Sequence, residues 1–258
     1  MSTAVERYRE ILRKTKDWDA YLKKESRLPG PRGNLELAHA AALEGTKQIF
    51  SRYASLEAGR APENTPLVFL AFCGVLGLGR LLAEGDPSQE RMLRRLAGDP
   101  RWRIREAVAT GLQFLGDRSW RDLHRLARVW MRGRPLERRA SVAAVAEPRL
   151  LVPDAAAVSA LRLMDQATRS LVKDGDGEPR RVLRQALGYA WSVVVAAAPK
   201  QGKAAMEGWF ASENDDVRWL MRENLGKARL RRLDPKWCAK WEKRLRPAGR
   251  PQGSRAKR

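Results

Sequence analysis

Apolar residues recur along this chain at the spacing of an amphipathic helix. One such face carries Ile104, Val108, Leu112 and Leu115, and a later one carries Leu183, Leu187 and Val194. Steps of three and four residues place these side chains on one side of a helix, with polar residues on the other. No alternating pattern typical of strands competes with them. The sequence therefore predicts an all-α fold.

A local motif returns along the chain. The copies DPRWRIREAV, RPLERRASV, EPRRVLRQAL and DVRWLMRENL align on Arg105, Arg139, Arg184 and Arg222, at intervals of 34, 45 and 38 residues. Periods of this size are typical of stacked helical pairs, because one pair cannot bury its apolar face without neighbours. The repeat therefore predicts a helical solenoid.

Three copies place an acidic residue six positions before the aligned arginine. The pairs are Asp99 and Arg105, Glu178 and Arg184, and Asp216 and Arg222. This pattern resembles the Asp and Arg positions of HEAT repeats, over roughly residues 60 to 230. The resemblance implies a HEAT-like helical-repeat solenoid of the ARM/HEAT superhelix class, in which these side chains form a structural ladder between successive repeats.

Longer segments extend the resemblance. LPGPRGNLELA, LAFCGVLGLGRLL, DPRWRIREAVA and DVRWLMRENLGKARLRRLDP are similar to an uncharacterised group of bacterial HEAT-repeat proteins. A distant likeness, at the level of fold, is to the HEAT-like DNA alkylation repair glycosylases, which hold DNA against a concave face. Those enzymes use an Asp near tryptophans, whereas this chain offers Glu106 near Trp102 and Glu223 near Trp219. No catalytic residue is carried over.

The domain organisation follows from the ends of the repeat region. Residues 1–246 are expected to form one domain with a capping helix at each end, and residues 247–258 a basic disordered tail. The N-terminal cap is predicted near Val5 to Lys24, before the turn-rich connector SRLPGPRGN (Ser26 to Asn34).

The most apolar segment, NTPLVFLAFCGVLGLG (Asn64 to Gly79), is shorter than the roughly 20 residues of a membrane span. It predicts a buried helix whose glycines permit close packing. The charged N-terminus lacks the apolar stretch of a signal peptide, so we expect a cytoplasmic location and no membrane span.

Positive charge is concentrated in two segments of the chain. The net charge is +21, of which residues 91–139 carry +9 and residues 218–258 carry +12. Residues 140–217 carry only −1. Clustering of this kind favours a polyanionic partner, nucleic acid and most simply DNA, or an acidic protein.

Two sets of side chains are candidates for contacting such a partner. Arg121, Arg125, Arg128 and Arg132 are spaced to form one row on a helix, and Arg231 and Arg232 belong to the second basic segment. Trp102, Leu136, Arg181 and Trp219 occupy equivalent positions opposite the core face, where Trp and Arg can stack on bases or enter a protein pocket. The alternatives are a solvated charged face and tryptophans that pack over neighbouring helices.

The sequence offers little for catalysis. With only His39 and His124, and with Cys73 and Cys238 as the two cysteines, it carries no paired ligands for a metal and no evident cofactor motif. We expect reduced structural thiols and a non-catalytic nucleic-acid-binding solenoid. A protein-interaction scaffold and a base-excision enzyme are the alternatives, and the oligomeric state stays open.

Overall fold

The computed structural model describes residues 3–152, 154–173 and 175–245, and this part of the chain folds into helices and connecting loops. The predicted all-α fold is confirmed. The helices are α1 (Thr3–Lys14), α2 (Trp18–Lys24), α3 (Leu35–Glu44), α4 (Lys47–Ala54), α5 (Pro66–Ala83), α6 (Gln89–Leu96), α7 (Trp102–Arg118), α8 (Trp120–Trp130), α9 (Pro135–Val145), the 3-10 helix η1 (Pro148–Leu150), α10 (Asp154–Lys173), α11 (Glu178–Ala197), α12 (Pro199–Glu207), α13 (Asp215–Leu225), α14 (Ala228–Leu233) and α15 (Pro235–Leu245). The tail predicted for residues 247–258 lies outside the described residues.

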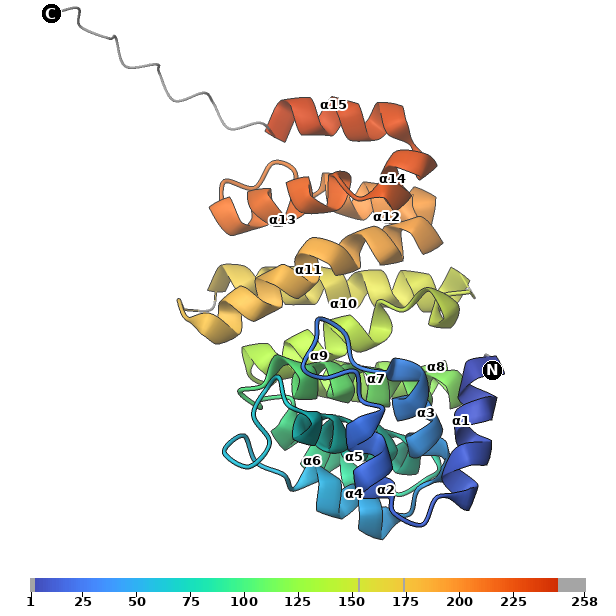
Figure 1. Ribbon diagram of the computed structural model, residues 1–258. Coiled ribbons are helices and arrows are strands. Elements are labelled where there is room, and N and C mark those ends of the chain that lie inside the picture. Colours follow the sequence, from blue (N-terminus) through green and yellow to red (C-terminus); the bar gives the residue numbers. More distant parts are fainter. Residues whose placement is uncertain (1–2, 153, 174, 246–258) are drawn as a thin grey trace, which may run out of the picture.

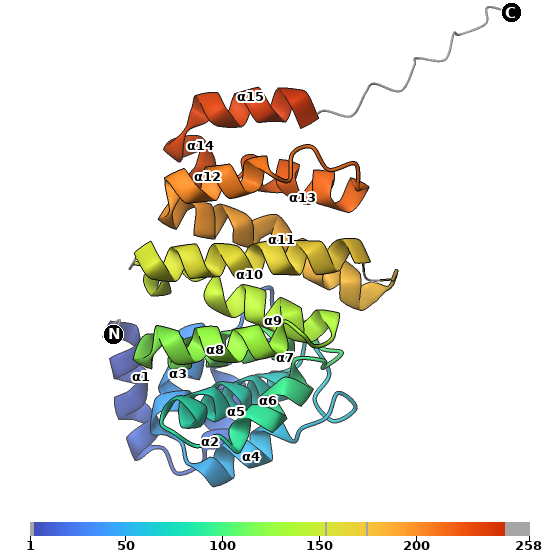
Figure 2. The same ribbon diagram turned by 180° about the vertical axis from the view of Figure 1, so that it is seen from behind.

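The helices form two rows along an elongated molecule (Figure 1). The inner row consists of α3, α5, α7, α9, α11, α13 and α15, each packed against the next. The outer row consists of α4, α6, α8, α10, α12 and α14, which alternate with the inner helices in the chain and pack against them. Figure 2, seen from behind, brings α8, α10 and α12 of the outer row to the front.

The prediction of a single N-terminal helix from Val5 to Lys24 is wrong. Two helices occupy this region, since α1 ends at Lys14 and α2 begins at Trp18. Asp17 is the N-cap of α2, and its carboxylate accepts a hydrogen bond from the amide of Ala20. A cap of this kind satisfies a backbone N–H that has no partner within the helix, so it starts a new helix inside a continuous helical pattern.

Each copy of the repeated motif opens a helix of the inner row, namely α7, α9, α11 and α13. Pro135 and Pro179 stand in the first turns of α9 and α11, where the missing N–H of proline costs no helical hydrogen bond. Asn214 starts α13 by accepting hydrogen bonds from two backbone amides of its first turn. Each of the four copies thus marks the start of one helix in the inner row.

Helix α5 lies in the core, as its composition predicts. It is long and apolar enough to suit a membrane span, but 78% of it is buried within the fold. A Cβ atom added at Gly79 would lie 2.4 Å from the Cα of Gly111 in α7, which is closer than real Cβ contacts. Glycine therefore lets α5 and α7 approach closely, as expected from the sequence.

Candidate nucleic-acid interface

Helix α8 presents a row of arginines on the outside of the outer row. Its start is capped by Ser119, and its opposite face buries Leu123, Ala127 and Trp130 against the core. With these residues turned inward, the helical period turns the arginines outward. The side chains exposed along this face are Arg121, Arg125 and Arg128. Arg132, which the spacing predicted on the same helix, is also exposed but lies in the turn that follows α8, because the helix ends at Trp130.

These arginines have few acidic partners. Arg125 forms an ion pair with Asp122 at 2.9 Å, one turn away on the same helix. The side chains of Arg121, Arg128 and Arg132 form no hydrogen bond or ion pair with any residue that the structure describes. Because exposed ion pairs such as the one at Arg125 contribute little free energy, all four guanidinium groups can exchange their present contacts for phosphate.

A second cationic row lies beside the first, on α10. The two helices pack together, and the indole of Trp120 donates a hydrogen bond to the Ser159 hydroxyl at 3.1 Å. The exposed cations of α10 are Arg162, Arg169 and Lys173, of which Arg169 pairs with Asp165 at 2.9 Å. Sequence reasoning missed this row because residues 140–217 carry −1 overall. Their helical spacing, at positions 162, 169 and 173, is the signal that could have found it.

His124 lies where cations of both rows affect its protonation. It lies half-buried on α8 with its ring stacked against Trp120, the centroids 6.1 Å apart. Burial lowers the pKa of His124, and the positive charges of Arg128 and Arg162 lower it further. Arg128 of α8 and Arg162 of α10 thus both act on the imidazole of His124. We name the exposed cations of α8 and α10, together with Arg132 in the turn after α8, the outer basic face.

The second set of predicted residues lies elsewhere. Trp102 is 46% exposed at the start of α7, in the inner row, and does not join the arginines of α8. Trp219 is half-buried, because its ring packs over Gly188 and is covered by the Arg184 guanidinium, 3.9 Å from its centroid. Leu136 is half-buried and Arg181 is exposed. The structure thus places these two sets of candidate residues on different elements.

A hollow of about 540 Å³ lies between α7, α9 and α11 on the inner side. Trp102 borders it, but α11 contributes Val182, Gln185, Ala186 and Tyr189 rather than Arg181. Arg181 is therefore not brought to this hollow. Tyr189, which is 48% exposed, is the aromatic side chain that α11 adds to it.

The predicted ladder residues make contacts of several kinds. Arg184 binds the Asp216 carboxylate at 3.1 Å and thus joins α11 to α13, and Arg180 pairs with the same carboxylate. Arg222 donates to the Leu245 carbonyl of α15 at 3.1 Å. Glu178 is exposed on the first turn of α11.

At the first copy the contacts differ from a ladder between repeats. Arg105 donates to the carbonyls of Asp99 and Pro100 in its own entrance loop, and the Asp99 carboxylate pairs with Arg101 at 2.8 Å. The link to the next repeat comes from Arg139, which donates to the Arg105 carbonyl and pairs with Glu106. At this copy, Arg105 and Arg139 therefore donate to backbone carbonyls, where the motif predicts a contact with an aspartate carboxylate.

The C-terminal cations form a separate group. Arg231 and Arg232 are exposed on α14, and Arg231 pairs with Glu242 at 3.0 Å. Helix α14 lies farther along the molecule, beyond α12 (Figure 2), so the structure does not bring these arginines to the α8 row. Arg231 and Arg232 therefore belong to a surface distinct from the α8 row.

The two glutamates beside tryptophans and the two cysteines have the following surroundings. Glu106 pairs with Arg139, and Glu223 lies 3.5 Å from the Lys227 ammonium. Burial raises the pKa of the Cys238 thiol to about 11 and raises that of Cys73 still further. Among the described residues, His, Cys, Asp and Glu side chains nowhere gather in a group of three that could hold a metal ion.

Comparison of this chain with protein-family models, curated proteins and solved structures finds no match. The functional argument therefore rests on the geometry and charge of the surfaces described above.

Proposed function

We propose that this protein binds double-stranded nucleic acid, in the first place DNA, through the outer basic face, as a HEAT-like helical solenoid that performs no chemistry on it. The observation that carries the proposal is the row of exposed arginines formed by Arg121, Arg125 and Arg128 of α8 and by Arg132 in the turn after it; among the described residues only Arg125 of these four forms an ion pair. Like charges at this spacing destabilise a helix, so an uncompensated row implies a ligand that neutralises it.

The dimensions of the row suit a nucleic-acid backbone. From Arg121 to Arg128 the rise of α8 spans roughly 10 Å, about the axial length of three base pairs. The cations of α10 follow a parallel line, because packed helices lie about 8 to 10 Å apart. This separation falls between the minor and major groove widths of about 6 and 12 Å. Two parallel cationic rows therefore favour a duplex, whose two backbones border a groove.

The stacked inner helices support the solenoid part of the proposal. The helices opened by the four repeat copies contact one another in sequence, and an outer helix lies between successive inner ones in the chain. An arrangement of this kind keeps the outer helices parallel and adjacent. Residues from separate repeats, such as Arg128 and Arg162, can then act on one ligand.

The test compares duplex binding by two charge-matched variants. Replacing Arg121, Arg125 and Arg128 by Glu should weaken binding of a short DNA duplex by about a hundredfold or more near 0.1 M salt, because each phosphate contact releases a counterion. The control replaces three exposed lysines near the N-terminus, Lys14, Lys16 and Lys24, by Glu, so that the change in net charge is the same. This control should retain wild-type affinity. Fluorescence anisotropy measures both.

Salt dependence distinguishes phosphate contacts from a general effect of charge. Replacing the same three arginines by Gln should make the slope of log K against log salt shallower by about two to three. Unchanged affinity and slope would exclude α8 from the interface. Tighter binding of single strands than of duplex would overturn the duplex assignment.

A second function, a protein-interaction scaffold, is favoured by one observation on the inner side. Trp102 is 46% exposed beside the hollow between α7, α9 and α11, and large exposed aromatics are typical anchors of protein interfaces. Pull-down after nuclease treatment separates the two functions. A protein partner that persists without nucleic acid and is lost with Trp102→Ala would support the scaffold.

A further inference from the structure

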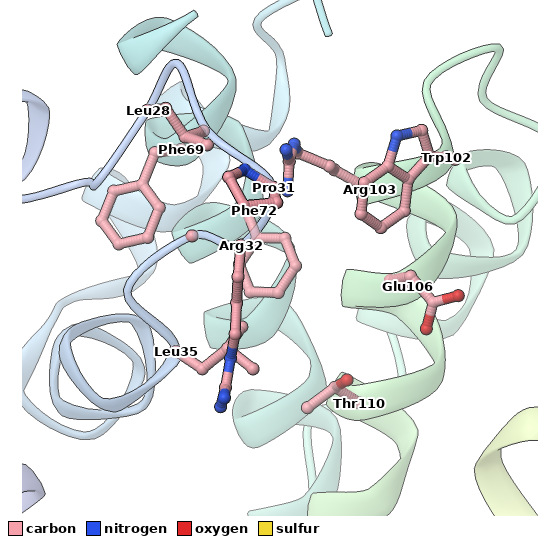
Figure 3. A pocket seen from close by; sticks show the side chains of 11 residues that line it. Leu28, Pro31, Arg32, Leu35, Phe69, Phe72, Trp102, Arg103, Glu106 and Thr110 are labelled. Carbon is pink, nitrogen blue, oxygen red and sulfur yellow. The ribbon is translucent and has the colours of Figure 1, made fainter. Parts of the chain in front are cut away.

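A separate pocket of about 280 Å³ lies on the other side of Trp102, between α5, α7 and the connector that precedes α3. Its walls are aromatic and apolar. Phe69 and Phe72 come from α5, Trp102 from α7, and Leu28 and Pro31 from the connector (Figure 3). A concave site with such walls and few polar groups is typical of small-molecule binding.

The connector wall is held in place by specific hydrogen bonds. Arg103 donates to the Gly30 carbonyl at 2.7 Å, and the Gly30 amide donates to the Asn64 side chain at 3.2 Å. At the end of the connector, Asn34 is buried and donates to the Tyr8 hydroxyl at 3.0 Å. These contacts tie the segment to α1, α7 and the loop before α5, so the cavity is preformed.

The charges around the pocket are unequally compensated. Arg103 is 8% exposed, and its Nε lies 3.3 Å from the Oε1 atom of Glu63. The Glu63 carboxylate therefore balances the positive charge of Arg103. Neither of these two atoms forms a hydrogen bond with a described residue. The Glu106 carboxylate points away from Phe72 (Figure 3) and pairs with Arg139.

Arg32 is different. Its side chain is 68% exposed, and its contact with the Glu36 carboxylate is 3.8 Å long. A pair at this distance and exposure neutralises the guanidinium only weakly. The pocket therefore combines an aromatic interior with one weakly compensated positive group in its lining.

The Arg103 guanidinium lies over the Trp102 ring, 4.5 Å from its centroid, so the indole offers its edge to a ligand. We propose that this pocket binds a small planar aromatic carboxylate, with its ring against Phe72 and the edge of Trp102 and its carboxylate on Arg32. Aromatic rings stack favourably in offset or tilted contacts, and a guanidinium forms charge-assisted hydrogen bonds with a carboxylate. The volume accommodates one or two fused rings, close to the lower limit for ligand pockets. The same chemistry occurs in free aromatic acids and in a C-terminal aromatic residue of a peptide.

Calorimetric titration with three probes of one shape tests the charge preference. The probes are 2-naphthoate, neutral 2-naphthalenemethanol and cationic 2-naphthylmethylammonium. The naphthoate should bind with one-to-one stoichiometry and about tenfold more tightly than the cation. A tetrapeptide ending in Trp with a free carboxylate, and its C-terminal amide, form the second arm. Tighter binding of the free-carboxylate peptide than of naphthoate would assign the ligand to a peptide end, and the reverse to a free acid.

Variants locate the site. Trp102→Ala should weaken naphthoate binding about tenfold, and Arg32→Gln should remove the preference for the anion while leaving binding of the alcohol unchanged. Arg27 is the matched control, because it belongs to the same connector, is 61% exposed and lies 4.0 Å from the same Glu36, but does not line the pocket. Arg27→Gln should bind naphthoate as the wild type does.

Circular dichroism establishes that each variant is folded. Absence of one-to-one naphthoate binding, equal affinity for anion and cation, or wild-type affinity in Trp102→Ala would each overturn the proposal. Loss of duplex binding in the α8 variants leaves this result unaffected, because no α8 residue lines the pocket.

Discussion

At the scale of single residues, the two histidines couple the stability of the fold to pH. Burial is the main cause that lowers the pKa of each, followed by Arg149 for His39 and by Arg128 and Arg162 for His124. In the unfolded chain both titrate near their ordinary value of about 6.5. Between the lowered folded pKa and this value, the unfolded chain binds more protons than the folded one. The free energy of unfolding therefore increases with pH across this window and decreases on acidification.

Chemical denaturation between pH 5 and 8 measures this dependence. The variant with both His39→Gln and His124→Gln should lose less free energy of unfolding on acidification than the wild type does. The same pH dependence in both proteins would contradict the assigned pKa shifts.

The tryptophans show which residue roles the sequence could predict. Trp102 and Trp219 are equivalent in the repeat, and their position opposite the core face was predicted for both. Only Trp102 is largely exposed, because Gly188 leaves space on α11 into which the Trp219 ring packs beneath Arg184. Such a neighbour comes from another repeat, so spacing within one motif contains no information about it.

At the scale of elements, the close approach of α5 and α7 depends on glycine. Gly79→Ala would place its Cβ 2.4 Å from the Cα of Gly111, a contact between backbones that no side-chain rotation relieves. We expect the substitution to reduce the free energy of unfolding by about 1 to 3 kcal/mol, as overpacking does. Gly59→Ala is the control, because a Cβ there meets nothing within 4 Å. Urea denaturation that showed equal stability for the two variants would disprove this account of the helix pair.

The start of a helix can be predicted where proline or an acidic residue stands at a break in the apolar pattern. It is missed where a capping residue lies inside a continuous helical pattern. Asp99 and Pro100 stand just before α7, Glu178 and Pro179 in the first turn of α11, and Asp216 in the first turn of α13, residue types that favour helix starts. Asp17 was not recognised as a cap, so α1 and α2 were predicted as one helix. An aspartate on a polar helix face and an aspartate that caps a helix differ in backbone conformation, which the pattern of apolar residues does not specify.

At the scale of the molecule, the positive charge lies on several surfaces. The net charge of a sequence segment did not show which of its cations are exposed on them. Residues 91–139 contribute the α8 row, but they also contain arginines held inside the fold, such as Arg101, Arg105 and Arg139. Residues 140–217 carry −1 overall and still supply the exposed cations of α10. Net charge over a segment thus predicted a polyanionic partner, but only the helical arrangement indicates which face would meet it.

The protonation of His124 in the presence of duplex DNA tests the central claim most directly. Phosphates held by Arg128 and Arg162 would bring negative charge close to the imidazole and raise its pKa. The chain has only two histidines, and His39 lies on α3 in the inner row, so NMR titration of the two imidazoles contains its own control. The account predicts that saturating duplex raises the pKa of His124 and leaves that of His39 unchanged. An unchanged His124 pKa under saturating duplex, or a shift of His39 alone, would contradict binding at the outer basic face.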